Sequence, residues 1–99
     1  MKVLKSAAAG TMESSDIMVT VSPGEGSIEI ELDSTVEMQY GRAIRDTITE
    51  TLKELEIDSA RVKAVDQGAL DCVIRARVQA SAYRACESED YHWEIRDEA

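Results

Sequence analysis

Two stretches of alternating hydrophobic and polar residues lie in the first third of the chain, at residues 17–21 and 28–33. In each, every second side chain is Ile, Val or Leu, which is the period of a β-strand with one buried face. The residues between them, 22–26, include one proline and two glycines, which favour a tight turn. This pattern predicts two antiparallel strands joined as a β-hairpin.

A long amphipathic helix is predicted from Thr35 to about Leu55. Its start is marked by Ser34-Thr35-Val36-Glu37, which matches a capping box in which Ser34 and Glu37 exchange side-chain to backbone hydrogen bonds. Its apolar positions recur at three- and four-residue steps: Val36, Tyr40, Ala43, Ile44, Thr47, Ile48, Thr51, Leu52 and Leu55.

The pattern returns to strands after the helix. Residues 61–65 predict a third strand, and residues 66–69 a turn. Alternation then resumes over residues 70–80 and favours a long fourth strand. Apolar residues beyond position 77 also fit helical spacing, so a change from strand to helix there stays open as an alternative.

Together these elements predict an α+β protein with two layers: one long amphipathic helix packed on a roughly four-stranded, mainly antiparallel sheet. The order is β-β-α-β-β plus a C-terminal tail, and residues 1–99 form a single domain. Residues 1–15 contain little large apolar surface, so we expect this segment to be mobile or weakly docked. The acidic tail, residues 87–99, is either a short edge strand or a docking tail.

Charge and composition exclude several classes of function. The net charge of −9 would repel a phosphate backbone, which argues against nucleic-acid binding. The same charge suits either a partner with a basic docking face or simple solubility. No run of 18 apolar residues is present, so we expect no membrane span and a cytoplasmic protein. Cys72 and Cys86 lack metal or redox spacing and are expected to be buried thiols in a reducing compartment.

The residues do not predict an active site. The chain has one histidine, His92, in the acidic tail, and two distant cysteines, which make neither a catalytic nor a zinc set. Glu29 and Glu31 lie on the polar face of a strand, where an acid–base pair would lack an enclosed cleft. We therefore expect no catalytic residue and no resident metal.

The polar stretch Gly10–Asp16, just before the first predicted strand, is the best candidate for a modified segment. Its adjacent hydroxyls, Ser14 and Ser15, lie between the carboxylates of Glu13 and Asp16. Such carboxylates are hard oxygen ligands that could help to hold a divalent ion in the site of a modifying transferase. Chemistry alone does not separate Ser14 from Ser15.

Two segments resemble the acyl carrier (gamma) subunit family of citrate lyase. Residues 10–21 match the family pattern A-G-[ST]-[ML]-E-S-S-D-I-M-[VI]-T-V from its glycine onward, and residues 65–72 resemble V-[DE]-[KRD]-[GD]-A-L-D-C, departing from it at Gln67. The match continues through residues 74–77 and at Arg84-Ala85. The combination of the two motifs at this separation is specific, whereas position 86 and the tail carry no match.

The resemblance implies that Ser14, the first serine of the pair, bears a phosphodiester-linked 2'-(5''-phosphoribosyl)-3'-dephospho-coenzyme A, hereafter phosphoribosyl-dephospho-CoA. In this family Glu13, Ser15 and Asp16 would be the neighbours of the attachment point. The thiol of the group is acetylated, the transferase (alpha) subunit exchanges acetyl for citryl, and the lyase (beta) subunit releases oxaloacetate. A prosthetic-group transferase and an acetylating ligase are implied as transient partners.

Three alternatives stay open. Asp33-Ser34-Thr35 partly resembles the pantetheine attachment motif of common acyl carriers, although Ser34 is also explained as a helix cap. The carrier subunit of malonate decarboxylase uses the same kind of arm. A small α+β interaction domain without an arm is the third. For docking of larger subunits, we expect either the polar strand face or the charged side of the helix: Arg42, Arg45, Asp46 and Glu50.

Overall fold

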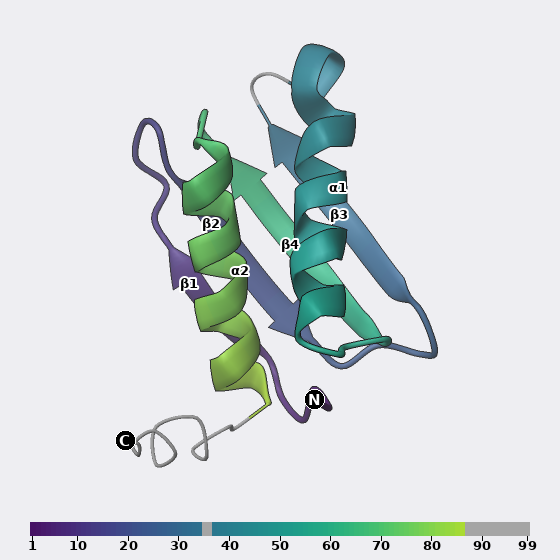
Figure 1. The fold of residues 1–99 in the computed structure, drawn as a ribbon. Helices are drawn as coiled ribbons and strands as arrows, with labels where there is room; N and C mark the ends of the chain where they lie inside the picture. The colour runs from purple at the N-terminus through teal and green to yellow at the C-terminus, as the bar shows by residue number, and fades with distance from the viewer. Residues whose placement is uncertain (35–36, 87–99) are drawn as a thin grey trace.

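The computed structural model describes residues 1–34 and 37–86, and the side chains of residues 37–39 are also outside the description. The chain folds into four strands and two helices (Figure 1). In chain order they are β1 (Ala7–Gly10), β2 (Ile17–Ser22), β3 (Ile28–Ser34), α1 (Glu37–Glu54), β4 (Ala60–Asp66) and α2 (Asp71–Ala85). The predicted α+β class is confirmed.

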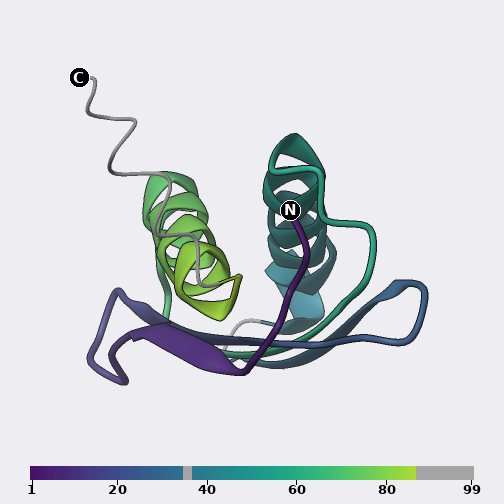
Figure 2. The same ribbon diagram turned by 90° about the horizontal axis from the view of Figure 1, so that it is seen from below.

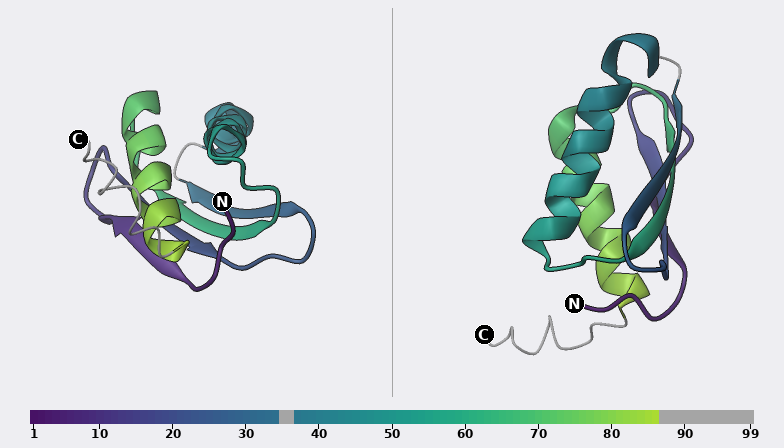
Figure 3. Two further views of the ribbon diagram at one scale, coloured as in Figure 1. Left: turned by 60° about the horizontal axis from the view of Figure 1, so that its bottom comes forward. Right: turned by 90° about the vertical axis from the view of Figure 1, so that its right-hand side faces the viewer.

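The strands form one sheet in the order β1-β2-β4-β3. β1 pairs with β2 and β2 with β4 in antiparallel fashion, whereas β3 and β4 are parallel, so the sheet is mainly antiparallel as predicted. α1 is the crossover between the two parallel strands, which need such a long connection. Both helices lie on the same face of the sheet, and no described element covers the other face (Figures 2 and 3).

The buried layer follows from the alternation seen in the sequence. Val19 in β2, which is fully buried, pairs with Ala64 in β4, and both lie under the helices. Ile48 of α1 and Val78 of α2 are also fully buried and close the core from above. Alternate positions point away from the helices, and there Lys63 of β4 stands beside Glu31 of β3 on the polar face. This produces the two-layer arrangement.

The predicted hairpin between residues 17–21 and 28–33 is wrong. Both strands exist, but β4 lies between β2 and β3 in the sheet. The connection from 23 to 27 passes the start of β4, where the amide of Ala60 donates to the carbonyl oxygen of Ser27 at 3.1 Å. A side chain at Gly24 would meet the backbone of Ala60, so glycine permits this close approach. Alternation fixes the face of a strand but not its neighbour.

The predicted fourth strand at residues 70–80 is also wrong, because this segment is helix α2. The buried residues on α2 are Ile74, Val78, Ser81, Ala82 and Ala85, which recur at three- and four-residue steps. The alternate positions that resembled a strand hold small residues such as Cys72 and Ala76, which are exposed on the helix. Cys72 is therefore not buried as expected, while Cys86 is.

The N-terminal segment, for which we expected mobility or weak docking, makes contacts with the rest of the domain. Val3 is buried, the amides of Leu4 and Lys5 donate to the carbonyl oxygen of Ala85, and β1 pairs with β2 along the sheet edge. Small side chains at 7–9 gave no strong strand signal, yet Ala9 fits beneath α2 because it is small. The tail at 87–99, with His92, and the capping residues 35–36 lie outside the described residues.

Candidate functional site

The Gly10–Asp16 stretch forms the loop that joins β1 to β2, at the sheet edge beside the start of α2 (Figure 1). Gly10 has a φ of 107°, which is rarely open to other residues. A Cβ at this position would collide with the carbonyl oxygen of Ile17. The glycine therefore lets the chain leave β1 and turn tightly against β2.

Ser14 and Ser15 occupy the two central positions of a turn at the tip of this loop. The amide of Asp16 donates to the carbonyl oxygen of Glu13 at 3.2 Å, which closes the turn. Ser15 has a φ of 65°, as at the second central position of a type II turn. Both serines are exposed, and within the described part of the chain neither hydroxyl has a hydrogen-bond partner.

Asp16 holds the base of the turn. Its Oδ2 accepts from Thr11 Oγ1 at 2.6 Å and from Arg77 Nη2 at 2.8 Å, and its Oδ1 accepts from Arg77 Nε at 3.1 Å. The amide of Ile17 also donates to Oδ1, at 2.7 Å. The pair with Arg77 is bidentate, and the Asp16 side chain is only 13% exposed.

These donors change the acidity of Asp16. The hydrogen bonds from Arg77, then from Thr11 and from the Ile17 amide, hold the pKa of the carboxyl well below its ordinary value, despite a smaller opposing effect of burial. Asp16 is therefore ionised throughout the physiological range. Asp16 is the anchor of the loop, and its carboxylate is engaged by donors within the protein, whereas Glu13 is exposed.

A second clamp joins the turn to the connection between β4 and α2. The Ser15 amide donates to the carbonyl oxygen of Gln67 at 2.7 Å, and the Gln67 amide donates to that of Asp16 at 2.9 Å. Gln67 and Arg77 were not predicted as site residues. A contact over 61 residues leaves no local signal in a single sequence, and Arg77 had been placed on the polar face of a strand.

The arrangement suits covalent attachment. The backbone around Ser14 is fixed from two sides, while its hydroxyl points to no internal partner and its neighbours at the tip are small or polar. A bulky group on this oxygen would displace no packed side chain. Ser14 thus fits an attachment point on geometric grounds, and the exposed Ser15 differs from it in its positive φ and in its amide, which is bonded to Gln67.

The rival attachment point is engaged elsewhere. Ser34 ends β3, and its hydroxyl donates to Oδ2 of the buried Asp66 at 2.9 Å. The capping box predicted around it includes Thr35, Val36 and the Glu37 side chain, which lie outside the described residues. Ser34 contributes to the junction of β3 and β4, and its hydroxyl is engaged there, whereas the Ser14 side chain is exposed.

Two of the four predicted docking residues also have internal roles. Arg45 Nη1 donates to the carbonyl oxygen of Ile30 at 3.0 Å, and Glu50 forms a 3.0 Å ion pair with Arg75 of α2. Arg42 and Asp46 are exposed on α1. In the part of the chain that the structure describes, neither helix is long and apolar enough to cross a membrane.

Fold and site together define a small α+β domain that presents a serine on a clamped turn. Comparison with known proteins supports this class. The family model described as "ACP: Malonate decarboxylase delta subunit (MdcD)" matches residues 4–85. A chain in the crystal structure of a Pseudomonas malonate decarboxylase hetero-tetramer in complex with malonate has the same fold, with a TM-score of 0.67 and 21% identity over 86% of this chain and 92% of that chain.

Curated relatives are more similar in sequence. A citrate lyase acyl carrier protein from Streptococcus uberis is 50% identical over 98% of this chain and 96% of its own length. One from Latilactobacillus sakei is 52% identical over 95% of this chain and 93% of its own length. The chain therefore belongs to the citrate lyase acyl carrier protein family, as its motifs indicated.

Proposed function

We propose that this chain is the acyl carrier subunit of a cytoplasmic citrate lyase and bears phosphoribosyl-dephospho-CoA on Ser14. The observation that carries the proposal is the exposed Ser14 hydroxyl at the tip of a turn fixed through Asp16 and Arg77. When bound, the group supplies a thiol that forms the thioester needed for carbon–carbon cleavage. The chain itself performs no bond-making step.

The structure suits this division of labour. A carrier needs a rigid body and an accessible tether, because tethering raises the effective concentration of the acyl group at both active sites. Here the tether would start from a turn whose base is fixed by a bidentate ion pair and two backbone hydrogen bonds. The proposed partners are the alpha transferase and beta lyase subunits, with the prosthetic-group transferase and acetylating ligase as transient ones.

For attachment, the Ser14 oxygen would form a new bond to the phosphorus of an activated phosphate donor, the bond from that phosphorus to its leaving group would break, and the Ser14 proton would pass to a base of the transferase. Glu13 is exposed next to Ser14, and its carboxylate would contact a divalent ion in that enzyme. Asp16 and Arg77 would act indirectly by holding the turn. Ser15 would contribute its backbone amide rather than its hydroxyl.

The function is tested by reconstitution. An extract that contains the other citrate lyase components but lacks this chain should cleave citrate after addition of natively produced wild type or the Ser15→Ala variant. The Ser14→Ala variant should restore no cleavage. Full restoration by Ser14→Ala would overturn the proposal.

Malonate decarboxylase carriers remain the second candidate because the matching family model carries that description and the structural neighbour has the same fold. The 50–52% identity to citrate lyase carriers favours citrate. A parallel reconstitution with malonate decarboxylase components discriminates between them: restored malonate decarboxylation without restored citrate cleavage would assign the chain to the second class. An interaction domain without an arm would show no mass adduct after native production.

A further inference from the structure

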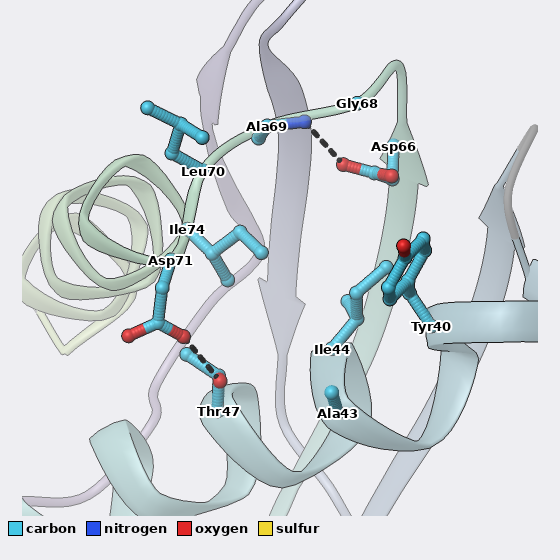
Figure 4. Close-up of a pocket in the computed structure, with 10 residues that line it drawn as sticks. All are labelled: Tyr40, Ala43, Ile44, Thr47, Asp66, Gly68, Ala69, Leu70, Asp71 and Ile74. Carbon is cyan, nitrogen blue, oxygen red and sulfur yellow. Dashed lines mark hydrogen bonds between the residues drawn. The ribbon is translucent and has the colours of Figure 1, made fainter.

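A groove opens between the two helices (Figure 4), at the same end of the molecule as the loop between β1 and β2 that contains Ser14 (Figure 1). Its volume is about 420 Å³. Ala43 and Ile44 of α1 line one side, Ile74 of α2 lines the other, and Ala69 of the β4–α2 connection closes the top (Figure 4). The lining is therefore mainly aliphatic.

Three polar side chains of the groove, Thr47, Asp66 and Asp71, already have hydrogen-bond partners within the protein. Thr47 Oγ1 donates to Asp71 Oδ1 at 2.7 Å and ties the two helices together (Figure 4). The buried Asp66 accepts from the amide of Ala69 at 3.0 Å and from Ser34. These carboxylates make the groove unfavourable for an anion, so its occupant should be neutral and largely apolar.

The rims carry large apolar side chains that nothing within the described residues covers. Leu70 is 69% exposed and Tyr40 is 55% exposed, on opposite sides of the opening. An occupant of the groove would remove part of both surfaces from water, which favours binding.

One wall of the groove is continuous with the attachment site. Asp66, Gly68, Ala69 and Leu70 form this wall, and the backbone of Gln67, which lies between Asp66 and Gly68 in the chain, makes the two backbone hydrogen bonds to the Ser14 turn. From Ser14 through the Ser15–Gln67 hydrogen bond to Leu70, the backbone path is at most roughly 20 Å. A group tethered to Ser14 is thus held at high effective concentration at the mouth of the groove.

We propose that the groove between α1 and α2 receives the neutral pantetheine stretch of the arm attached to Ser14, so that the carrier shelters its own thiol between transfers. This inference rests on the proposed function. The pantetheine stretch is uncharged, and its methyl and methylene groups match the aliphatic lining, while its amide and hydroxyl groups would face the open side of the groove. The phosphodiester lies next to Ser14 and the pyrophosphate directly precedes the pantetheine stretch, so both would stay outside the groove, away from Asp66 and Asp71. No covalent step is involved.

Two Ala→Phe variants provide a matched test. Ala43 is exposed and lines the groove, so Ala43→Phe fills it without crowding the core, whereas Ala76 is exposed on α2 away from the groove. Natively produced, arm-bearing wild type and both variants are treated with a neutral alkylating reagent, and the reaction rate of the arm thiol is measured. The rate should be roughly three- to tenfold higher in Ala43→Phe than in wild type and Ala76→Phe, because reactivity follows the fraction of undocked arm.

NMR of the wild type alone gives a second readout that needs no variant. Signals of Ile44, Ala69 and Ile74 should shift between the arm-free and arm-bearing chains, independently of protein concentration. Equal thiol rates in all three proteins together with unshifted groove signals would overturn the inference. Shifts that grow with concentration would also overturn it and would indicate a second copy in the groove.

Intact mass separates the two levels of failure. A natively produced chain without an adduct contradicts the proposed function, and the groove inference falls with it. An adduct on Ser14 with no protection of the thiol and no groove shifts contradicts the groove inference alone.

Discussion

At the scale of single residues, Asp16 decides the shape of the site. Its carboxylate accepts from Thr11, Ile17 and Arg77, and its backbone joins the turn to Gln67. The sequence located the exposed loop from its polar, small-residue character. The sequence could not reveal the ion pair between Asp16 and Arg77, because no local pattern indicates a contact between residues on different elements. The choice of Ser14 over Ser15 rests on family resemblance, because both hydroxyls are exposed and the two residues differ only in backbone geometry.

Ser15 is predicted to tolerate glycine better than Ser14 does. A φ of 65° costs a residue with a Cβ about 1–2 kcal/mol, which glycine avoids. Against this, glycine gains up to about 1 kcal/mol of unfolded-state entropy. Ser15→Gly should therefore leave the free energy of unfolding unchanged or raise it by up to about 1 kcal/mol. Ser14→Gly, without the positive φ, should lower it by about 0.5–1 kcal/mol. Urea denaturation of both variants measures the difference, and a reversed order would refute the turn geometry.

Acid should lower the stability of the wild-type fold, in part because Asp16 becomes protonated. The pKa of its carboxyl is lower in the folded than in the unfolded chain, so its stabilising effect is complete above the ordinary value of 3.8 and is lost as pH falls further. Asp16→Asn should be less stable than wild type at neutral pH and should lose less stability on acidification. Thermal denaturation at neutral and acidic pH measures both effects.

Asp58→Asn, which changes an exposed carboxylate, is the control for the acid experiment. It should retain the acid sensitivity of the wild type. If the stability of Asp16→Asn instead fell in acid as steeply as that of wild type, Asp16 would not be the source of the pH dependence.

At the scale of elements, the sequence predicted β2, β3, α1 and β4 within a few residues of their observed bounds. It missed β1, because alanines carry little strand signal, and it assigned α2 as a strand. Two exposed positions of α2 hold Cys72 and Ala76, whose apolar side chains completed the alternating pattern of a strand. Both side chains are small, so their exposure on the helix surface costs little. The pairing of β2 with β4 was also missed, because a strand pattern shows which side is buried and not which strand lies alongside.

Gly10 is predicted to be essential for the junction between β1 and β2. Gly10→Ala adds the strain of its φ of 107° to a collision with the Ile17 carbonyl, and should cost at least about 2 kcal/mol of unfolding free energy. Gly26→Ala is the matched control, because its φ is 98° and its Cβ would meet nothing within 4 Å. It should cost about 1 kcal/mol, from strain alone. If urea denaturation showed equal losses of unfolding free energy in Gly10→Ala and Gly26→Ala, the close approach between Gly10 and the Ile17 carbonyl would be contradicted.

At the scale of the whole molecule, both helices cover one face of the sheet, and the Ser14 turn projects from the edge near the start of α2 (Figures 1 and 2). The α+β class and the two-layer arrangement could be predicted from the sequence, because one amphipathic helix and several amphipathic strands can bury their apolar faces against each other in few ways. Strand order was not, because it depends on contacts between distant segments.

The net charge of −9 leads to a prediction about assembly. If larger subunits dock this carrier through a basic face, association should weaken as salt rises, since screening shortens the reach of charge from about 10 Å at 0.1 M to about 3 Å at 1 M. Sedimentation or pull-down with the partner subunits over a salt series measures this. Association that is unchanged or tighter at high salt would assign docking to apolar contacts.

The central claim is that Ser14 is the single point of covalent attachment. Peptide mass spectrometry of protein from a host that makes and attaches the arm tests it most directly, on wild type, Ser14→Ala and Ser15→Ala. The account predicts a nucleotide-sized adduct on the peptide containing Ser14 in wild type and Ser15→Ala, and none in Ser14→Ala. An adduct that persists in Ser14→Ala, or that disappears only in Ser15→Ala, would contradict it.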